Sequence, residues 1–389
     1  TVINCDDFEV KDFQKGILRL ERCNSIGKIS TSGQTTLHLS STKIQELDLQ
    51  DTELVLMEAQ AQKVTLEKCI VTSIQNTYQG EVTINGGTFT SHKDTFQDKL
   101  STDDNTQLAL IEPTAQGKVQ FSTSSITVQK GTFQDEVTIE DSPYTDNEST
   151  YQDKVTISGD KSVVVLRSAE LQDELNCSDA NTLNAVDLQA KGKVTLESGS
   201  YILRDLSAED DVSITDASAI MQSGECKAKF TADNSALKLR DCSFQDDVSI
   251  TGGSVSSDAN EYQGKCSFES TTLESAFDKF QDELTCESLL HHSAIWKPDG
   301  NILKCTISGD SASSSIKLDQ LQAEEFTCTD FGNATIRVLT ATKCTIQDNH
   351  YAHLLDGTCT QMTVTDSSTV LLNSVTSTNA TITGVCTLI

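Results

Sequence analysis

Pairs of neighbouring carboxylates are the residues of this chain best suited to acid–base chemistry. They are Asp135-Glu136, Asp210-Asp211 and Asp282-Glu283. Two carboxyl groups that face one sugar can serve as the acid and the base, or the nucleophile, of glycoside hydrolysis. Each pair, however, precedes the same kind of apolar segment, and a catalytic pair normally occurs only once. We therefore interpret the pairs as solvated turns and predict that the protein is not an enzyme and has no cofactor.

A second candidate site lies between Ser288 and Pro298. This segment holds the adjacent His291 and His292 and the only tryptophan, Trp296. A histidine pair can bind a metal or move protons, and a tryptophan can stack on a sugar or anchor a partner. We interpret the segment as an insertion loop whose tryptophan packs on the fold, with a contact site as the alternative.

Other catalytic and metal-binding motifs are missing from the sequence. It contains no Cys-x-x-Cys pair, Gly-rich phosphate loop, nucleophile elbow or metalloprotease motif. The many acidic residues could attract Ca²⁺, but the spaced oxygen ligands of an EF-hand or a nonapeptide loop are absent. We therefore predict no metal site.

A short motif recurs along the chain and must position all of these residues. It consists of an aromatic residue, Gln, Asp or Gly, a charged residue and then Val-Thr-Ile, and clear copies begin at Tyr78, Phe133, Tyr151, Phe244 and Phe280. With its Val as the marker, the usual step between copies is 18 residues. A repeat this short cannot bury its own apolar face, so it must stack on its neighbours into a solenoid.

Within each copy the apolar residues alternate with polar ones, which indicates strands rather than helices. Val137 and Ile139 are expected to point inward, and Thr138 outward. The Gln of the motif is expected to form a stacked amide ladder. The exchange of Asp and Gly two residues before the marker indicates a tight turn, which a left-handed backbone would suit. One copy near Ala228 matches the motif poorly.

The chain thus resembles a parallel β-helix, an architecture that many families share. We predict an all-β fold, a single-stranded parallel β-solenoid of about twenty coils with three short faces per coil. Right-handed winding is favoured by the general crossover preference. Residues 1–389 are expected to form one continuous domain, with irregular coils over 1–60 and an extended coil with an insertion over 287–301.

The 13 cysteines are an odd number, so at least one thiol must stay free or pair between chains. Six fall at inward positions of the repeat and are expected to be buried thiols: Cys177, Cys266, Cys286, Cys305, Cys328 and Cys344. The others are the better disulfide candidates: Cys5, Cys23, Cys69, Cys226, Cys242, Cys359 and Cys386.

The net charge of −29 excludes a basic nucleic-acid surface. No stretch reaches the roughly 18 apolar residues of a membrane-spanning helix, so membrane insertion is not expected. The chain begins with Thr1, which suggests a processed, secreted protein. Four possible glycosylation sequons support that interpretation: Asn147, Asn176, Asn333 and Asn379.

These observations favour a secreted structural protein, a rigid rod that serves as the subunit of an extracellular filament, appendage or surface coat. Both ends of the sequence are strand-like and show no helical cap, so we expect coils of successive subunits to stack end to end. Cys5 and Cys386 lie near those ends and could seal the joint between subunits.

Three other functions stay open. The protein could be a fibre or adhesin that binds a glycan or a receptor, or a carbohydrate-active β-helix. It could also bind ice, because some antifreeze β-solenoids display Thr ladders. Two Thr columns on one flat face are expected there, and this sequence shows mainly one. Thr363-Val364-Thr365 is a rare double, and Gln120, Asn176 and Lys229 interrupt the single column.

Overall fold

The computed structural model describes residues 1–289, 291–295, 302–309, 315–366, 369–384 and 387–388. This part of the chain contains 49 strands and no helix, and it forms an all-β parallel β-solenoid of about twenty coils, as predicted. The chain divides into two compact units, Thr1–Thr195 and Leu196–Ile389, and each is a stack of such coils. Its continuity as one domain and its right-handed winding stay predictions.

Each regular coil consists of three strands, which form three faces of the stack. One coil contains β16 (Val137–Glu140), β17 (Pro143–Asn147) and β18 (Thr150–Tyr151). We call these faces the marker face, the second face and the short face, in that order. Each strand pairs in parallel with the equivalent strand of the next coil, so that Val137 aligns with Val155 and Ile139 with Ile157. Because alternate side chains point inward, the aligned Val and Ile residues form continuous buried columns.

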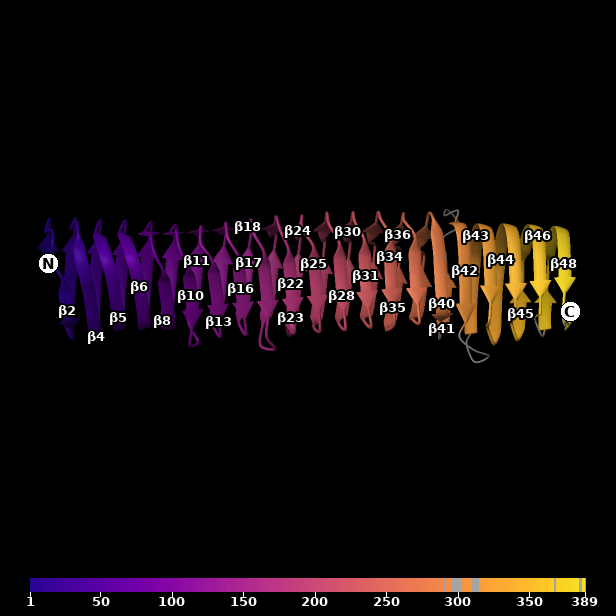
Figure 1. Ribbon diagram of the computed structural model, residues 1–389, viewed down its shortest axis with the longest axis horizontal. Helices are drawn as coiled ribbons and strands as arrows, with labels where there is room; N and C mark the ends of the chain where they lie inside the picture. Colours follow the sequence, from indigo (N-terminus) through magenta and orange to yellow (C-terminus); the bar gives the residue numbers. More distant parts are fainter. Residues whose placement is uncertain (290, 296–301, 310–314, 367–368, 385–386, 389) are drawn as a thin grey trace. The chain divides into compact units, whose positions relative to one another are not determined.

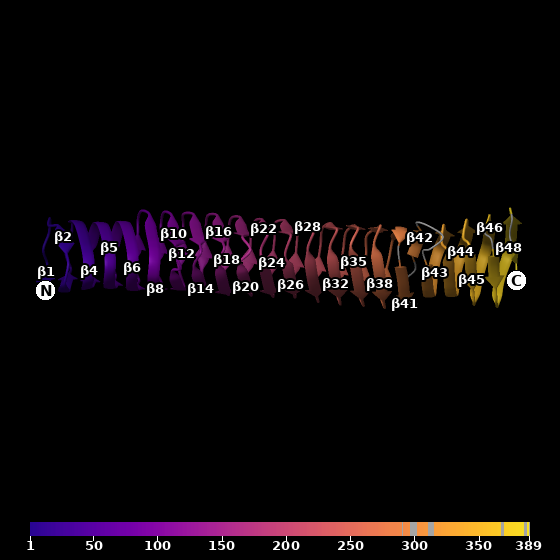
Figure 2. The same ribbon diagram turned by 90° about the horizontal axis from the view of Figure 1, so that it is seen from below.

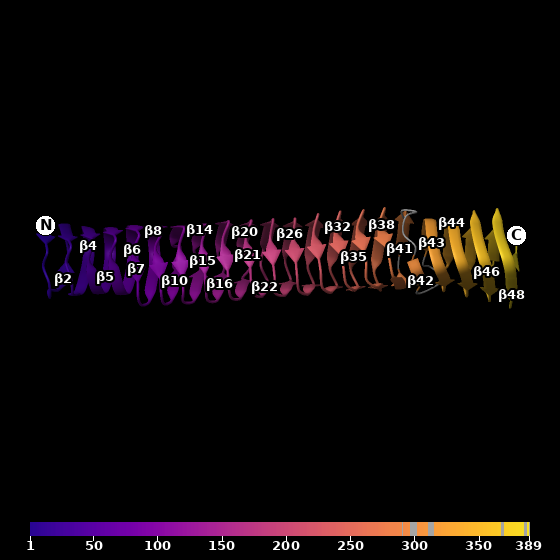
Figure 3. The same ribbon diagram turned by 90° about the horizontal axis from the view of Figure 1, so that it is seen from above.

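Figure 1 shows the strands of successive coils side by side within each unit. In Figure 3 the short-face strands β15 (Thr132–Phe133) and β21 (Glu170–Leu171) lie between the rows of the marker face and the second face. Figure 2 shows the same separation in the second unit, where the marker-face strand β28 (Val212–Thr215) and the second-face strand β32 (Ala236–Arg240) lie at opposite edges.

In the first unit the early coils have long strands that turn from one face to the next. The long strands are β4 (Ile26–Ser40), β5 (Lys43–Met57), β6 (Gln60–Ile74) and β8 (Val82–His92), and the shorter β1 (Val2–Ile3), β2 (Val10–Phe13) and β3 (Gly16–Glu21) precede them. The later marker-face strands, besides β16, are β10 (Leu100–Asp103), β13 (Val119–Ser122), β19 (Val155–Ser158) and β22 (Leu175–Ser178). The second face adds β11 (Gln107–Ile111), β14 (Ser125–Gln129), β20 (Val163–Arg167) and β23 (Thr182–Val186). The short face adds β7 (Thr77–Tyr78), β9 (Thr95–Phe96), β12 (Thr114–Ala115) and β24 (Gln189–Ala190).

In the second unit the long strands come last. The marker face contains, besides β28, β31 (Phe230–Asp233), β34 (Val248–Thr251), β37 (Cys266–Glu269), β40 (Glu283–Leu289) and β42 (Ile302–Gly309). The second face adds β26 (Ser200–Arg204), β29 (Ser218–Gln222), β35 (Ser254–Asp258), β38 (Thr272–Ala276) and β41 (His291–Ile295). The short face contains β27 (Ser207–Ala208), β30 (Glu225–Cys226), β33 (Ser243–Phe244), β36 (Glu261–Tyr262) and β39 (Lys279–Phe280). The last strands are β43 (Ser315–Thr329), β44 (Asn333–Gln347), β45 (Tyr351–Leu354), β46 (Gly357–Thr365), β47 (Thr369–Leu372), β48 (Val375–Thr383) and β49 (Thr387–Leu388).

The coil that matched the motif poorly is a regular coil in the structure. Phe230 aligns with Val212 on one side and with Val248 on the other, so it holds the marker position. Thr231 then stands in the outward hydroxyl column, and Lys229 does not interrupt that column. The motif was hard to see because Phe and Ala232 replace the usual Val and Ile.

Aromatic rings, rather than glutamine amides, stack in the core of the short face. The centroids of Tyr262 and Phe280 are 4.7 Å apart with their planes 4° from parallel, and Phe133 and Tyr151 stack in the same way at 4.9 Å. The Gln residues of the motif point to solvent, and Gln172 and Gln245 donate to Glu side chains. The predicted amide ladder is therefore wrong, because the motif's Gln lies on the outside of the turn.

The turn before the marker is tight, but its backbone is not left-handed. Where Asp stands there, its carboxylate accepts a hydrogen bond from the next N–H, as in Asp135 with Glu136 at 2.8 Å. Where Gly stands there, a side chain would collide with the preceding coil: a Cβ on Gly264 would lie 2.5 Å from the carbonyl carbon of Asp246. Left-handed residues instead mark other corners, among them Asp241 and Phe277, with φ of 53° and 58°.

Candidate functional site

The carboxylate pairs considered for catalysis serve contacts between neighbouring coils. Glu136 forms an ion pair with Lys118 at 2.9 Å, and Glu283 pairs with Lys265 at 3.0 Å. In the second unit Asp211 accepts a hydrogen bond from the backbone of Lys229 at 3.2 Å. These partners each lie one coil away, so the acidic side chains lie along the stack rather than around a cleft.

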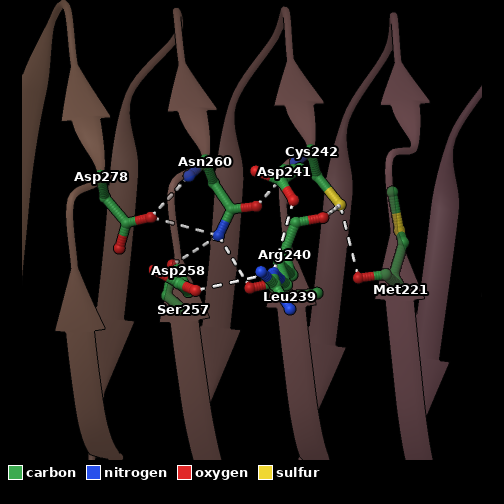
Figure 4. A network of polar contacts seen from close by, with 9 residues as sticks. All are labelled: Met221, Leu239, Arg240, Asp241, Cys242, Ser257, Asp258, Asn260 and Asp278. Atoms are coloured by element: carbon green, nitrogen blue, oxygen red, sulfur yellow. Dashed lines mark hydrogen bonds and ion pairs between the residues drawn. The ribbon is translucent and has the colours of Figure 1, made fainter.

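A network of buried polar side chains lies at one corner of the coils in the second unit (Figure 4). The amide of Asn260 donates to Oδ1 of Asp278 at 3.2 Å, to the Ser257 hydroxyl at 2.9 Å and to the carbonyl of Leu239 at 3.0 Å. Its Oδ1 accepts from the backbone N–H of Cys242 at 2.8 Å. The network thus ties together the corners of three successive coils.

The same network occurs in the first unit at equivalent positions of the repeat. Asn76 donates to Oδ1 of Asp94 at 3.2 Å, to the Ser73 hydroxyl at 2.7 Å and to the Leu56 carbonyl at 3.0 Å. Its Oδ1 accepts from the backbone of Ala59 at 2.8 Å. Each Asn is followed one coil later by the Asp, so both networks read Ser-x-x-Asn-x-Tyr and then Ser-x-x-Asp-x-Phe in the sequence.

The carboxylates of these networks are saturated with hydrogen bonds. Asp94 accepts from the Ser91 hydroxyl at 2.6 Å and from the Asn76 backbone at 2.7 Å, in addition to the Asn76 amide. Burial raises the pKa of Asp94, as it does that of Asp278, while these hydrogen bonds oppose the rise. Groups that are fully buried and fully bonded cannot reach a substrate, so the networks act as structural ties.

A related cluster around Asp146 lies in the first unit. The Asp146 carboxylate accepts hydrogen bonds from the hydroxyls of Ser149 and Tyr151, the latter at 3.1 Å, and Tyr151 also contacts the hydroxyl of Tyr144 at 2.6 Å. Burial raises the pKa of Asp146 to about 6. No basic side chain is bonded to this carboxylate in the described structure, so nothing of opposite charge offsets the effect of burial on its pKa.

Grooves on the outer faces of the second unit are shallow and hold isolated carboxylates. One of about 300 Å³ lies over β29, β32, β35 and β38 and includes Glu274. Another, of about 280 Å³, includes Asp233. The third, of about 390 Å³, includes Glu324 and six threonines. Since glycoside hydrolysis generally uses two facing carboxyl groups, none of these grooves has the side chains for it.

The six threonines of the third groove form two columns on one face. Thr340, Thr358 and Thr376 align in successive coils, and Thr342, Thr360 and Thr378 lie two residues further along the same strands. All six side chains are exposed. The residues between them align as well, with Ala341 beside Cys359 and Cys359 beside Ser377. The sequence predicted mainly one Thr column, on the marker face. The double column lies on a different face of the coil, which the repeat motif does not include.

The marker face of the second unit carries an unbroken hydroxyl column. It runs through ten aligned residues: Ser213, Thr231, Ser249, Ser267, Thr285, Thr306, Thr327, Thr345, Thr363 and Thr381. In the first unit Gln120 and Asn176 do stand in the equivalent column, as expected from the sequence.

The predicted contact loop is only partly described. His291 and His292 lie in β41, where His292 aligns with Leu273 and His291 with Ser315. Trp296 lies outside the described residues, and the contact site stays a prediction. Within the described ranges, no group of three or more His, Cys, Asp or Glu is arranged to hold a metal ion, and no helix is long and apolar enough to cross a bilayer.

The predicted glycosylation sites differ in exposure. Asn333 at the start of β44 and Asn379 in β48 are exposed. Asn176 in β22 is half-buried, and so is Asn147, which ends β17 rather than lying in a loop. Glycosylation at all four stays a prediction.

No disulfide joins any two cysteines in the described part of the chain. The six cysteines expected to be buried thiols are buried. Cys23, Cys69, Cys226, Cys242 and Cys359, expected to be better disulfide candidates, are also buried free thiols. Cys69 and Cys242 donate to carbonyls of their own coils at 3.4 and 3.2 Å. Burial raises the pKa of Cys242 to about 11 and that of Cys226 to about 12, which keeps these thiols protonated and unreactive.

The cysteines near the two ends of the sequence differ from this buried set. Cys5 is exposed, and Cys386 lies outside the described residues. A covalent joint between them stays a prediction. Comparison of the chain with protein-family models, with curated proteins and with solved structures gave no match.

Proposed function

We propose that this protein is a non-enzymatic structural β-solenoid that serves as the subunit of an extracellular filament, appendage or surface coat. One observation carries this proposal: polar groups of the kinds that elsewhere form active sites are used here to hold one coil to the next. Asp278 and Asn260 are closed off by hydrogen bonds between coils, and Glu136 and Glu283 pair with lysines of adjacent coils. Such a use of polar residues favours mechanical integrity over chemistry.

Electron microscopy of the purified protein over a range of concentrations tests this role. The proposal expects filaments or sheets that grow with concentration, under both reducing and oxidising conditions. Particles that stay monomeric throughout, with both native termini verified by mass spectrometry, would rule out self-assembly of the protein by itself.

Assays on a panel of polysaccharides test the enzymatic alternative, and no turnover is expected. Turnover that disappears in Asp135→Asn/Glu136→Gln, while the fold stays intact, would show that the turn carboxylates are catalytic.

A second candidate function, ice binding, is favoured by the two threonine columns on the short face of β44, β46 and β48. Along each column the hydroxyl and methyl groups repeat at the coil spacing of about 4.8 Å. The six positions are uncharged in a protein with net charge −29, and they border a shallow groove. A periodic patch of six uncharged threonines of this kind suits an ordered layer of water better than a charged ligand, although Glu324 lies at its edge.

Measurements of thermal hysteresis and of ice recrystallisation test this second function. Thr360→Lys places a charge in the middle of one column and should abolish the activity. Gln347→Lys, an exposed change on the marker face of the same coils, should leave it intact. Absence of activity in the unmodified protein would eliminate ice binding and leave the structural role untouched.

A further inference from the structure

A column of alternating charges runs beside the marker column in each unit. It consists of the residue directly before each marker, and we call it the charge column. In the first unit its members are Lys28, Glu46, Lys63, Glu81, Lys99, Lys118, Glu136, Lys154, Glu174 and Lys193. In the second unit its charged members are Asp211, Lys229, Asp247, Lys265, Glu283, Lys304, Glu325 and Lys343. From Lys28 to Lys193 and from Asp211 to Lys343 the sign alternates from coil to coil, except between Lys99 and Lys118. The last two positions of the column, Gln361 and Asn379, are uncharged.

The structure places consecutive members of this column side by side. Glu283 aligns with Lys304, Lys304 with Glu325, and Glu325 with Lys343. Several neighbours form ion pairs: Lys28 with Glu46 at 3.0 Å, Lys118 with Glu136 at 2.9 Å, Lys154 with Glu174 at 3.6 Å and Lys265 with Glu283 at 3.0 Å. Every charged member except Lys99, Lys118 and Lys343 therefore has an opposite charge in each coil of its own unit that is adjacent in the column, and Lys343 aligns with Gln361 on one side.

Composition does not account for the alternation. Acidic residues outnumber basic ones, 58 to 29, so a column filled without regard to sign would be mostly acidic. Exposed ion pairs also contribute little to stability in water. The column members are exposed or half-buried, so stabilisation of the folded state is a weak reason for so regular a pattern.

The repeat itself creates a specific folding error that the charge column can prevent. All coils present nearly the same inward residues, so a strand could pair with the coil after next and loop out one coil. In such a pairing Val248 would still align with another marker residue, Val212, and the hydroxyl residues that follow the markers would still align with each other. It would, however, place like charges side by side, for example Asp211 beside Asp247 or Lys229 beside Lys265. Like charges directly opposite each other in a sheet are destabilising.

We propose that the charge column is a register code that makes each coil pair with its immediate neighbour and disfavours the omission of a coil. Alternation of sign is the simplest pattern that distinguishes the next coil from the one after it. The apolar and hydroxyl columns cannot make this distinction because they repeat in every coil. The code acts during folding, when a nascent strand chooses among coils that are otherwise equivalent.

A charge exchange within the full chain tests the proposal. The double variant Lys229→Asp/Asp247→Lys keeps composition and net charge. It places a second acid beside Asp211 and a second base beside Lys265, and it makes the coil-skipping pairs attractive. The matched control, Lys229→Gln/Asp247→Gln, changes the same two positions and removes the same hydrogen bond from the Lys265 N–H to Asp247, but it creates no like-charged pair.

The readout is refolding from denaturant, followed by hydrogen exchange and limited proteolysis mapped by mass spectrometry. The exchanged variant should show a ratio of correctly paired to coil-skipped molecules that is lower by roughly tenfold, with fast exchange and new cleavage confined to one looped-out coil. Molar salt should restore much of the loss by screening. The control should refold like the unmodified protein. Equal refolding of the exchanged variant and the unmodified protein, or equal failure of variant and control, would overturn the proposal.

Discussion

Asp278 lies one coil after Asn260, and its Oδ1 accepts both the backbone N–H and the side-chain amide of that asparagine, at 2.8 and 3.2 Å. Asp94 and Asn76 repeat this relationship in the first unit, at 2.7 and 3.2 Å. Parallel strands alone would leave the asparagine N–H at this corner without a backbone partner, since the chain is turning there. The aspartate of the following coil supplies the missing acceptor.

Asp278→Ala should destabilise the second unit by about 2–4 kcal/mol, because it leaves buried donors on Asn260 and Ser275 unpaired. Asp278→Asn keeps an acceptor and should cost about 1 kcal/mol. Urea unfolding of each variant measures the difference. Asp160→Ala, at an exposed position without a network, serves as control and should be close to neutral. Equal losses for Asp278→Ala and Asp160→Ala would show that the network contributes nothing.

Asp146→Asn should remove a pH-dependent penalty on stability. The pKa of Asp146 in the folded protein is about 6, above the value of about 3.9 for an unfolded chain, so the native state binds this proton more tightly. The stabilisation of the folded state by this bound proton is fully present below about pH 4 and is lost as the pH rises through about 6. The wild type therefore loses about 3 kcal/mol over this range relative to the variant.

Denaturant unfolding at several pH values compares wild type with Asp146→Asn. The difference in unfolding free energy should grow in favour of the variant between about pH 4 and 6 and then stay constant. Asp160→Asn removes an exposed carboxylate and serves as the control for the loss of one acidic group. A difference that does not change with pH would mean that Asp146 titrates in the folded protein as it does in an unfolded chain.

Val137→Asp and Thr138→Asp test the inward and outward assignments on one strand. Val137 is fully buried between Val119 and Val155, so a charge there should cost several kcal/mol, about 3 or more. Thr138 lies on the outer side of the same strand, and a charge there should cost about 1 kcal/mol or less. Thermal or urea unfolding of both variants gives the comparison, and similar losses would contradict the register.

Gly264→Ala tests the close approach of successive coils at the turn before the marker. The added Cβ would meet backbone atoms of Asp246 and Asp247 at 2.5–2.8 Å, so one coil must move away from the other. We expect a loss of about 2 kcal/mol or more. Asp246→Ala changes the equivalent turn one coil earlier and should cost about 1 kcal/mol through the lost bond to the Asp247 N–H. If Asp246→Ala proved the more damaging change, the turn would depend on the carboxylate rather than on the absence of a side chain.

The sequence was sufficient to predict the solenoid because the inward columns are nearly uniform. Val137, Val155 and their equivalents repeat at a fixed step, and only stacked parallel strands bury all of them together. The turns were predicted less well. The Gln of the motif looked like a ladder residue because it recurs, but recurrence does not distinguish the inside of a turn from its outside.

The buried networks were missed for a different reason. Asn76 and Asp94 are polar, and polar residues between strands are normally interpreted as surface turns. The spacing carried a usable signal, because Ser-x-x-Asn-x-Tyr is followed one repeat later by Ser-x-x-Asp-x-Phe in both units. Only the aligned coils show that these side chains complete one another across the stack.

The left-handed corners offer regularly spaced attachment points. Ser223, Asp241, Ala259 and Phe277 occupy the same corner in four successive coils, each with positive φ. The N–H of Asp241 still bonds to the Asp258 carbonyl at 3.0 Å, and the strand ends at this corner, so a peptide inserted directly after the corner residue would leave that bond in place. Grafted epitopes or enzymes would then stand at multiples of about 4.8 Å along one edge of the unit. A multivalent receptor would then bind several grafts at once, and its avidity would depend on the distance between them. That distance is set by which coils carry a graft.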